Sequence, residues 1–289
     1  MATAAGVVAI FMWGMLAVLT VNASEIPPFQ LLTICFFVSA LLIFVKRLLK
    51  REPLTTPPKL SLTQWIATVG GLFGFHFCYF LAIRFAPAIE VSLIGYLWPL
   101  LFGIAVASQA TRIFAIIGGV VGFIGCALLV IGGETLGIDL QYATGYGLAL
   151  ACALIWAGYS WYMGDAKTQV EDIGWVCGAV AVFSLLVHLL IESTVLDLYL
   201  SAWISALLLG LGPVGGAFYL WDIGVKFGNR PLLASLSFAT PVISSVALAV
   251  FGINPLTTTI LLAVALIVTG ALISNLMPKY FVKFRTVIR

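Results

Sequence analysis

The sequence predicts an all-α integral membrane protein whose ten transmembrane helices form two inverted five-helix repeats. Three observations predict this fold: ten long apolar stretches, a one-sided placement of basic residues, and a weak internal repeat. Hydrophobic residues make up 62% of the 289 residues and charged residues only 9%, whereas soluble domains carry about 25% charged residues. The composition therefore favours one membrane domain that accounts for the whole chain.

Each apolar stretch is long enough to cross a bilayer as a helix, which takes about 17–25 residues. The expected spans are Ala2–Asn22, Pro28–Lys46, Leu62–Arg84, Ala88–Ser108, Ile113–Ile131, Tyr146–Gly164, Ile173–Glu192, Ala202–Phe227, Pro231–Phe251 and Leu256–Asn275. The first span resembles a signal peptide that ends at Val21-Asn22-Ala23. It lacks a basic n-region and is longer than a usual h-region, so we interpret it as an uncleaved helix.

The basic residues orient these spans. With the N-terminus inside and strict alternation, Arg84 is the only one of the 14 Lys and Arg residues on the outer side. This asymmetry follows the positive-inside rule and predicts that both termini are cytoplasmic. The net charge of +3 is explained by the inner loops and tail, and it does not indicate nucleic-acid binding.

The chain repeats itself weakly. A shift of 142 residues places Arg84 on Lys226, Tyr96 on Phe238 and Pro99 on Pro241, and a shift of 143 places Trp13 on Trp156. Each repeat holds five helices, so the second enters the membrane from the opposite side. Such inverted repeats are typical of secondary transporters. The predicted repeats are residues 1–137 and 138–289, the second ending in a short basic tail.

Glycines are frequent in three of the expected spans. They predict close helix packing, or helices that bend during function: Gly70, Gly71, Gly74, Gly118, Gly119, Gly122, Gly125, Gly210, Gly212, Gly215 and Gly216. The five cysteines lie inside apolar spans without metal-ligand spacing, so we interpret them as free core thiols.

Motifs of catalysis are absent from the sequence. There is no P-loop, no HExxH, no GxSxG and no pair of carboxylates within one span. An ATP-driven pump or an intramembrane hydrolase is therefore not expected. We predict no enzyme activity, no catalytic residue, no cofactor and no metal site.

Pro99 and Pro241 interrupt the fourth and ninth spans at matched places. Each removes a helical hydrogen bond, which membranes tolerate where the backbone is buried in protein or lines a cavity. The alternative is an ordinary kink. Matched interruptions in two repeats indicate a transporter site, so we expect both prolines to line one cavity.

Aromatic residues surround the prolines at depths where interfacial Tyr and Trp are not expected. They either fill a core or line a cavity suited to a flat, largely apolar ligand. The members of this set are Trp13, Phe75, Tyr79, Tyr96, Trp98, Trp156, Phe218, Trp221 and Phe238.

Few ionisable residues lie within the spans. His76 is the deepest; it has either a functional role or a hydrogen bond to a nearby carbonyl. The spacing predicts a structural salt bridge between Asp222 and Lys226, and an interfacial pair between His188 and Glu192. We expect Arg84 and Glu90 to be solvated.

Together these features resemble the EamA-type transporters of the drug/metabolite transporter superfamily. The resemblance spans the whole chain and depends on the ten spans, the repeat, Trp13-Gly14, the stretches Tyr79–Pro99 and Phe218–Pro241, and Gly118–Gly125. It implies a multi-pass bacterial inner-membrane exporter of amino acids, mainly aromatic ones. EamA domains often place Gly-Glu after the fourth helix of each repeat, where this chain has Ser108-Gln109 and Gly252-Ile253, so no role of that glutamate transfers.

We therefore expect an alternating-access secondary transporter that is a monomer in membrane lipid, with an amino acid or similar small molecule as substrate and no nucleic-acid partner. The predicted substrate-binding residues are His76, Tyr79, Tyr96, Trp98, Pro99, Trp13, Trp156, Phe218, Trp221, Phe238 and Pro241. The alternatives are export of a lipophilic cation or drug, export of a nucleotide sugar, and a non-transporting scaffold.

The topology is testable by labelling. A cysteine introduced at Thr55, in the basic connection 47–61, is expected to stay unlabelled by an impermeant thiol reagent in intact cells, because that loop faces the cytoplasm. Labelling after permeabilisation is the control. Reaction from outside intact cells would contradict the proposed orientation.

Overall fold

The computed structural model describes residues 1–132, 137, 139–255 and 257–280, and every regular element within them is a helix. Three parts of the chain named in the sequence or its predictions lie outside the described residues: Leu256, the expected first residue of the tenth span, Glu134, and the basic tail after Tyr280. Nine described helical segments are long and apolar enough to cross a membrane, and one bent helix pair completes a tenth span. The expected all-helical multi-span fold is confirmed.

The ten spans follow the order expected from the sequence. They are α1 (Ala2–Gly14) with α2 (Leu16–Val21), α3 (Pro28–Lys50), α4 (Leu62–Phe85), α5 (Ala88–Gly95) with α6 (Trp98–Val106), α7 (Arg112–Ile131), η1 (Leu140–Tyr142) with α8 (Ala143–Asp165), α9 (Asp172–Ile191), α10 (Leu200–Leu211) with α11 (Gly216–Phe227), α12 (Arg230–Ser237) with α13 (Thr240–Val250), and α14 (Thr259–Asn275).

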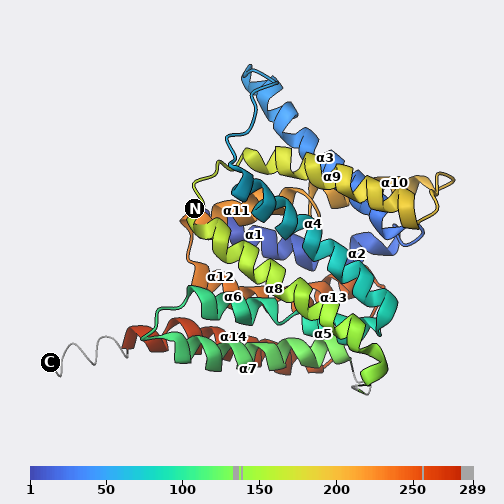
Figure 1. Ribbon diagram of the computed structural model, residues 1–289. Coiled ribbons are helices and arrows are strands. Elements are labelled where there is room, and N and C mark those ends of the chain that lie inside the picture. The colour runs from blue at the N-terminus through green and yellow to red at the C-terminus, as the bar shows by residue number, and fades with distance from the viewer. Residues whose placement is uncertain (133–136, 138, 256, 281–289) are drawn as a thin grey trace.

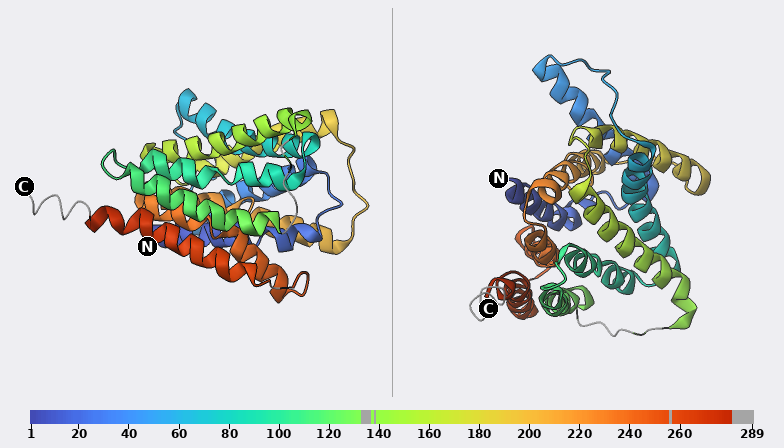
Figure 2. Two further views of the ribbon diagram at one scale, coloured as in Figure 1. Left: turned by 90° about the horizontal axis from the view of Figure 1, so that it is seen from below. Right: turned by 60° about the vertical axis from the view of Figure 1, so that its left-hand side comes forward.

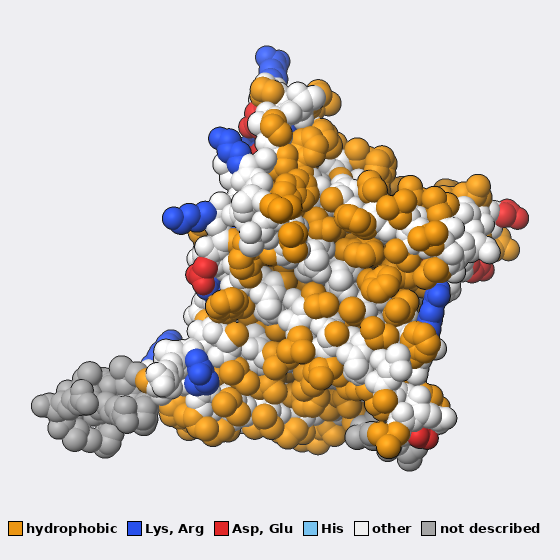
Figure 3. Space-filling model, in the orientation of Figure 1, with side chains coloured by type: hydrophobic (Ala, Val, Ile, Leu, Met, Phe, Trp, Pro, Cys, Tyr) orange, Lys and Arg blue, Asp and Glu red, His pale blue; other side chains and the backbone are white. Residues whose placement is uncertain are grey.

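The helices run roughly parallel to one another, and the N-terminus and the end of α14 lie at the same side of the bundle (Figures 1 and 2). We call this side the terminal face and the other side the opposite face. The turns after α2, α4 and α9 lie at the opposite face. Between the two faces, apolar side chains cover the surface in Figure 3, whereas Lys and Arg gather mainly along the terminal face.

Helix packing follows the two repeats. The closest pairs are α7 with α14, α3 with α9, α4 with α8, and α1 with α11. Exchanging each span for its partner in the other repeat maps α7–α14 and α3–α9 onto themselves and exchanges α4–α8 with α11–α1. The packing therefore has the two-fold relation that an inverted repeat predicts.

Glycine permits the close approach of α7 and α14. A Cβ on Gly118 would overlap the Gly270 carbonyl oxygen and lie 2.8 Å from the Ser274 nitrogen. These neighbours are backbone atoms of α14, which cannot rotate away. By contrast, the glycines of the eighth span also mark a break, because the chain is not helical between Leu211 and Gly216. The sequence had predicted one continuous helix there.

Substitution of Gly118 by alanine is expected to destabilise the protein by about 1–3 kcal/mol, because the added methyl group overpacks a backbone contact. Thermal unfolding in detergent should show a lower midpoint than the wild type. The matched control is Gly147→Ala, whose Cβ on α8 meets no atom within 4 Å and which replaces glycine with a better helix former. Equal midpoints for the two variants would contradict the packing role of Gly118.

Candidate functional site

A cavity of about 600 Å³ lies between the two repeats and is lined by residues from both of them. Seven predicted site residues line it: Trp13, His76, Tyr79, Tyr96, Trp98, Trp156 and Phe218. Val21 and Ser24, which are exposed in the turn region after α2, line it as well. The cavity therefore extends from the opposite face to the middle of the bundle.

Tryptophans from three spans form the floor of the cavity. The ring of Trp13 lies 6.2 Å from Trp98 and 5.7 Å from Trp156, and Trp98 lies 6.2 Å from Trp156, all edge-on. Edge-to-face contact is a favourable geometry for aromatic rings. Trp221 lies behind this floor, 5.0 Å from Trp13, and donates its indole N–H to Ser160 Oγ at 3.0 Å. It does not line the cavity and instead supports the rings that do.

The polar groups of the cavity are few and mostly uncharged. The Nδ1 atom of His76 lies 2.7 Å from the Leu72 carbonyl oxygen. Because a carbonyl oxygen only accepts, Nδ1 donates, and in a neutral ring Nε2 is left as an acceptor. The hydroxyls of Tyr79 and Ser92 are 3.1 Å apart. His76 thus makes the hydrogen bond to a nearby carbonyl that was one of the two alternatives, and it also lines the cavity.

The two prolines stand at equivalent helix breaks. Tyr96 ends α5 and Phe238 ends α12, while Pro99 and Pro241 are each the second residue of the next helix. The α12–α13 pair bends by 48°. In the second repeat, the Ser237 carbonyl accepts a hydrogen bond from Thr240 Oγ1 at 2.9 Å.

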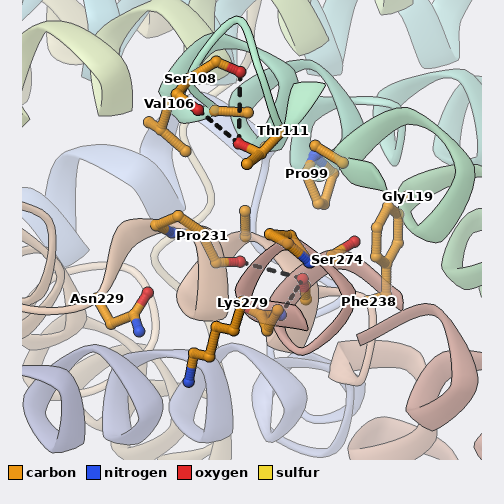
Figure 4. Close-up of a pocket in the computed structure, with 17 residues that line it drawn as sticks. Pro99, Val106, Ser108, Thr111, Gly119, Asn229, Pro231, Phe238, Ser274 and Lys279 are labelled. Atoms are coloured by element: carbon orange, nitrogen blue, oxygen red, sulfur yellow. Dashed lines mark hydrogen bonds between the residues drawn. The ribbon is translucent and has the colours of Figure 1, made fainter. Parts of the chain in front are cut away.

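The expectation that both prolines line one cavity differs from the structure. Pro99 and Phe238 line a second cavity of about 280 Å³ near the terminal face (Figure 4), and Pro241 is buried and lines neither cavity. Successive helical residues point about 100° apart. Trp98 and Thr240 therefore face the first cavity while the prolines beside them face elsewhere.

Sequence reasoning missed several lining residues. Leu209, Pro213 and Val214, at the break between α10 and α11, line the first cavity, as does Thr20 of α2. Pro213 between two glycines was the available signal for a break. No comparable signal marks Thr20, because single hydroxyl residues are common in membrane helices.

Polar contacts, buried at Lys226 and partly exposed at Arg230, join helix ends at the terminal side. The ammonium group of Lys226 donates to Asp222 Oδ2 at 2.8 Å, to the Thr168 carbonyl at 2.8 Å and to Thr168 Oγ1 at 2.7 Å. This confirms the predicted Asp222–Lys226 pair. Arg230, the first residue of α12, bonds to the Gly164 and Val225 carbonyls and to Asp165. These contacts join the ends of α8, α11 and α12.

The opposite face has a different set of charges. Glu192 lies 2.9 Å from His188 Nδ1, as predicted, and also accepts from the backbone N–H groups of Phe29 and Gln30 at the start of α3. Arg84 lies 3.7 Å from Glu192, and Glu90 accepts a hydrogen bond from Tyr146. Arg84 is exposed to solvent as expected, with a long contact to Glu192 in addition, whereas Glu90 is partly buried and bonds to Tyr146.

Metal ligands do not gather anywhere in the described part of the chain. No group of three or more His, Cys, Asp or Glu side chains is close enough there to hold a metal ion, and all five cysteines are free thiols.

Comparisons with known proteins agree with this architecture. Residues 1–131 match the EamA-like transporter family. The chain is 36% identical over 284 residues to the aromatic amino acid exporter YddG of Ancylobacter novellus, which covers 96% of this chain and 98% of the relative. It is 27% identical over 195 residues to the protein of the same name in Escherichia coli, covering 63% of this chain and 66% of that one.

A solved structure described as "Crystal structure of protein" superposes with a TM-score of 0.89 at 35% identity and covers 97% of this chain and 98% of its own. The match to a full-length relative at this identity shows the family. The chain is a multi-pass membrane protein that belongs to the EamA-like transporter family of the drug/metabolite transporter superfamily.

Proposed function

We propose that this protein exports aromatic and other amino acids across the bacterial inner membrane by alternating access through the first cavity. The observation that supports this most is the tryptophan floor formed by both repeats, together with relatives named as aromatic amino acid exporters. Both termini face the cytoplasm in this proposal, and the cavity is then open to the outside. We propose that the monomer is the functional unit.

The chemistry of the cavity suits a zwitterion with a flat side chain. The substrate ring packs edge-on against Trp13, Trp98 and Trp156, as these rings pack against each other. The ammonium group donates to His76 Nε2, and the carboxylate accepts from the hydroxyl of Tyr79 or Tyr96. Because neutral partners compensate poorly for desolvated charges, affinity is weak, which suits export down a steep gradient.

The charge of the lining argues against the other substrate classes. None of the described residues that line the first cavity is Asp, Glu, Lys or Arg. A nucleotide sugar needs cationic groups for its phosphates, and a lipophilic cation gains from a buried carboxylate. Aromatic faces alone can attract a cation, so a cation remains the second candidate.

Flux from proteoliposomes tests this function. Vesicles with purified protein are expected to release radiolabelled phenylalanine, tryptophan or tyrosine faster than protein-free vesicles, and to release a lipophilic cation or a nucleotide sugar no faster. Trp98→Ala and Tyr96→Ala are expected to raise KM by roughly three- to tenfold, because each removes aromatic contact with the substrate.

The matched control is Trp161→Ala, since Trp161 lies on α8 with 48% exposure at the lipid-facing surface. It should leave KM unchanged. Wild-type kinetics in both Trp98→Ala and Tyr96→Ala would place the binding site elsewhere. Aggregation of both variants would show that these rings serve core packing.

Transport is expected to proceed without a proton gradient. No described carboxylate lines the first cavity, and Asp222 is paired with Lys226 on its terminal side. The decisive measurement is flux at equal pH on both sides with a protonophore present, where the rate should match that without protonophore. Loss of flux there, or accumulation of substrate driven by a pH step alone, indicates a proton antiporter.

A further inference from the structure

Two basic residues occupy equivalent places in the two repeats but differ in their surroundings. A shift of 142 residues places Arg84, near the end of α4, on Lys226, near the end of α11. Because the repeats are inverted, Arg84 lies at the opposite face and Lys226 at the terminal face. The first cavity extends to the face that holds Arg84 and is closed at the face that holds Lys226.

Lys226 is fully engaged where the bundle is closed. Its side chain is 4% exposed, and its three hydrogen bonds go to Asp222 and to two oxygens of Thr168. An ammonium group has three donors, so none is left over. Thr168 belongs to the connection between α8 and α9, and Lys226 therefore ties the end of α11 to that connection.

Arg84 is loosely held where the bundle is open. Its side chain is 45% exposed, and its contact to Glu192 is long at 3.7 Å. Glu192 is already held by His188 and by the first N–H groups of α3. A carboxylate at a helix N-terminus is stabilised by the helix dipole. Glu192 therefore has its partners without Arg84, and the guanidinium group is free to move.

The repeat identifies another partner for Arg84. The shift of 143 residues that places Trp13 on Trp156 also places Glu25 on Thr168. Glu25 lies in the turn between α2 and α3, where it is exposed, and the structure shows no hydrogen bond or ion pair of its side chain among the described residues. Its neighbours Ser24 and Ile26 line the mouth of the first cavity.

We propose that Arg84 and Glu25 form the latch that closes the first cavity at the opposite face. In the closed state the guanidinium group of Arg84 leaves Glu192 and pairs with the Glu25 carboxylate, as Lys226 now binds Thr168. At the same time Lys226 releases Thr168 and the terminal side opens. This inference rests on the proposed alternating access and names the contact that closes one of its two states.

The buried pair at the terminal face is suited to release. The Asp222 side chain is fully buried, and its Oδ1 atom has no hydrogen-bond partner among the described residues. An unpaired buried oxygen has a free-energy cost that water removes when the site opens. In this proposal, opening the terminal side breaks the two bonds of Lys226 to Thr168, and water then hydrates Asp222 and Lys226.

A double-mutant cycle tests the latch. Arg84→Gln and Glu25→Gln are each expected to lower turnover in proteoliposomes about fivefold, the effect of one partly exposed ion pair. The double variant should be no slower than the slower single variant, because both remove the same contact. The control cycle combines Arg84→Gln with Asp139→Asn. Asp139 lies in another loop at the same face, so the fold-changes in turnover of the two single variants should multiply in the double variant.

Cross-linking gives a second, independent readout. Cysteines are placed at positions 25 and 84 in a chain without its five native cysteines, and a short bifunctional methanethiosulfonate is added. Cross-linking should occur and stop flux, and reduction should restore flux. The same reagent on cysteines at positions 84 and 139 should leave flux unchanged.

The outcomes separate this latch from the proposed function. Suppose that the wild type transports amino acids. If the losses of turnover in Arg84→Gln and Glu25→Gln then multiply in the double variant, or if positions 25 and 84 do not cross-link, the latch is overturned and the proposed function stands. Absence of wild-type amino acid flux overturns the function, and cross-linking then still shows whether the opposite face closes through these two positions.

Discussion

Every break in a membrane helix leaves backbone N–H and C=O groups without intrahelical partners in a medium that supplies none, and the arrangement of this bundle depends on that constraint. Its breaks therefore lie where protein or a cavity surrounds them. The break between α10 and α11 is bridged by Val214 N to the Leu209 carbonyl and Ala217 N to the Gly212 carbonyl, both at 2.9 Å. Gly215 is required there, because a Cβ would overlap the Gly210 carbonyl oxygen. The backbone thus leaves the helix at this break beside the first cavity, which Leu209, Pro213 and Val214 line.

The breaks also explain how one cavity can be walled by both repeats. A continuous helix presents only one stripe to its neighbours, whereas a broken span turns its two halves separately. Trp98 follows the break in the fourth span and faces the first cavity, while Phe238 at the matched break faces the second. The equivalence of the two breaks in sequence therefore produces different environments, because the inverted repeat places equivalent residues toward opposite faces of the membrane. When the protein is open at one face only, the two copies of a motif therefore lie in different surroundings.

The fold and part of the site could be predicted because they depend on local composition and on the repeat. Span length and the basic residues specify ten helices, and matched prolines identify the two breaks at Tyr96 and Phe238. Long-range contacts could not be predicted in this way. Glu192 caps α3 across more than 160 residues of sequence. No sequence pattern near Pro28 predicts that an acidic residue binds there. The same holds for which neighbour of a proline faces the cavity, since helix rotation is set by packing against other helices.

Charged groups in this protein lie at the ends of the helices. Their main effect there is to join particular helix ends to one another. Lys46 and Arg47 at the end of α3 contact Glu171 at the start of α9, and Glu192 at the end of α9 binds the start of α3. The α3–α9 pair is thus joined at both ends: at one end basic residues of α3 meet Glu171 of α9, and at the other Glu192 at the end of α9 meets the N-terminus of α3. Arg84 and Lys226 belong to α4 and α11, the spans packed on α8 and α1 around the cavity. A helix pair joined at both ends, beside spans that each carry one basic residue, is the arrangement expected if the cavity changes face while α3 and α9 keep their contact.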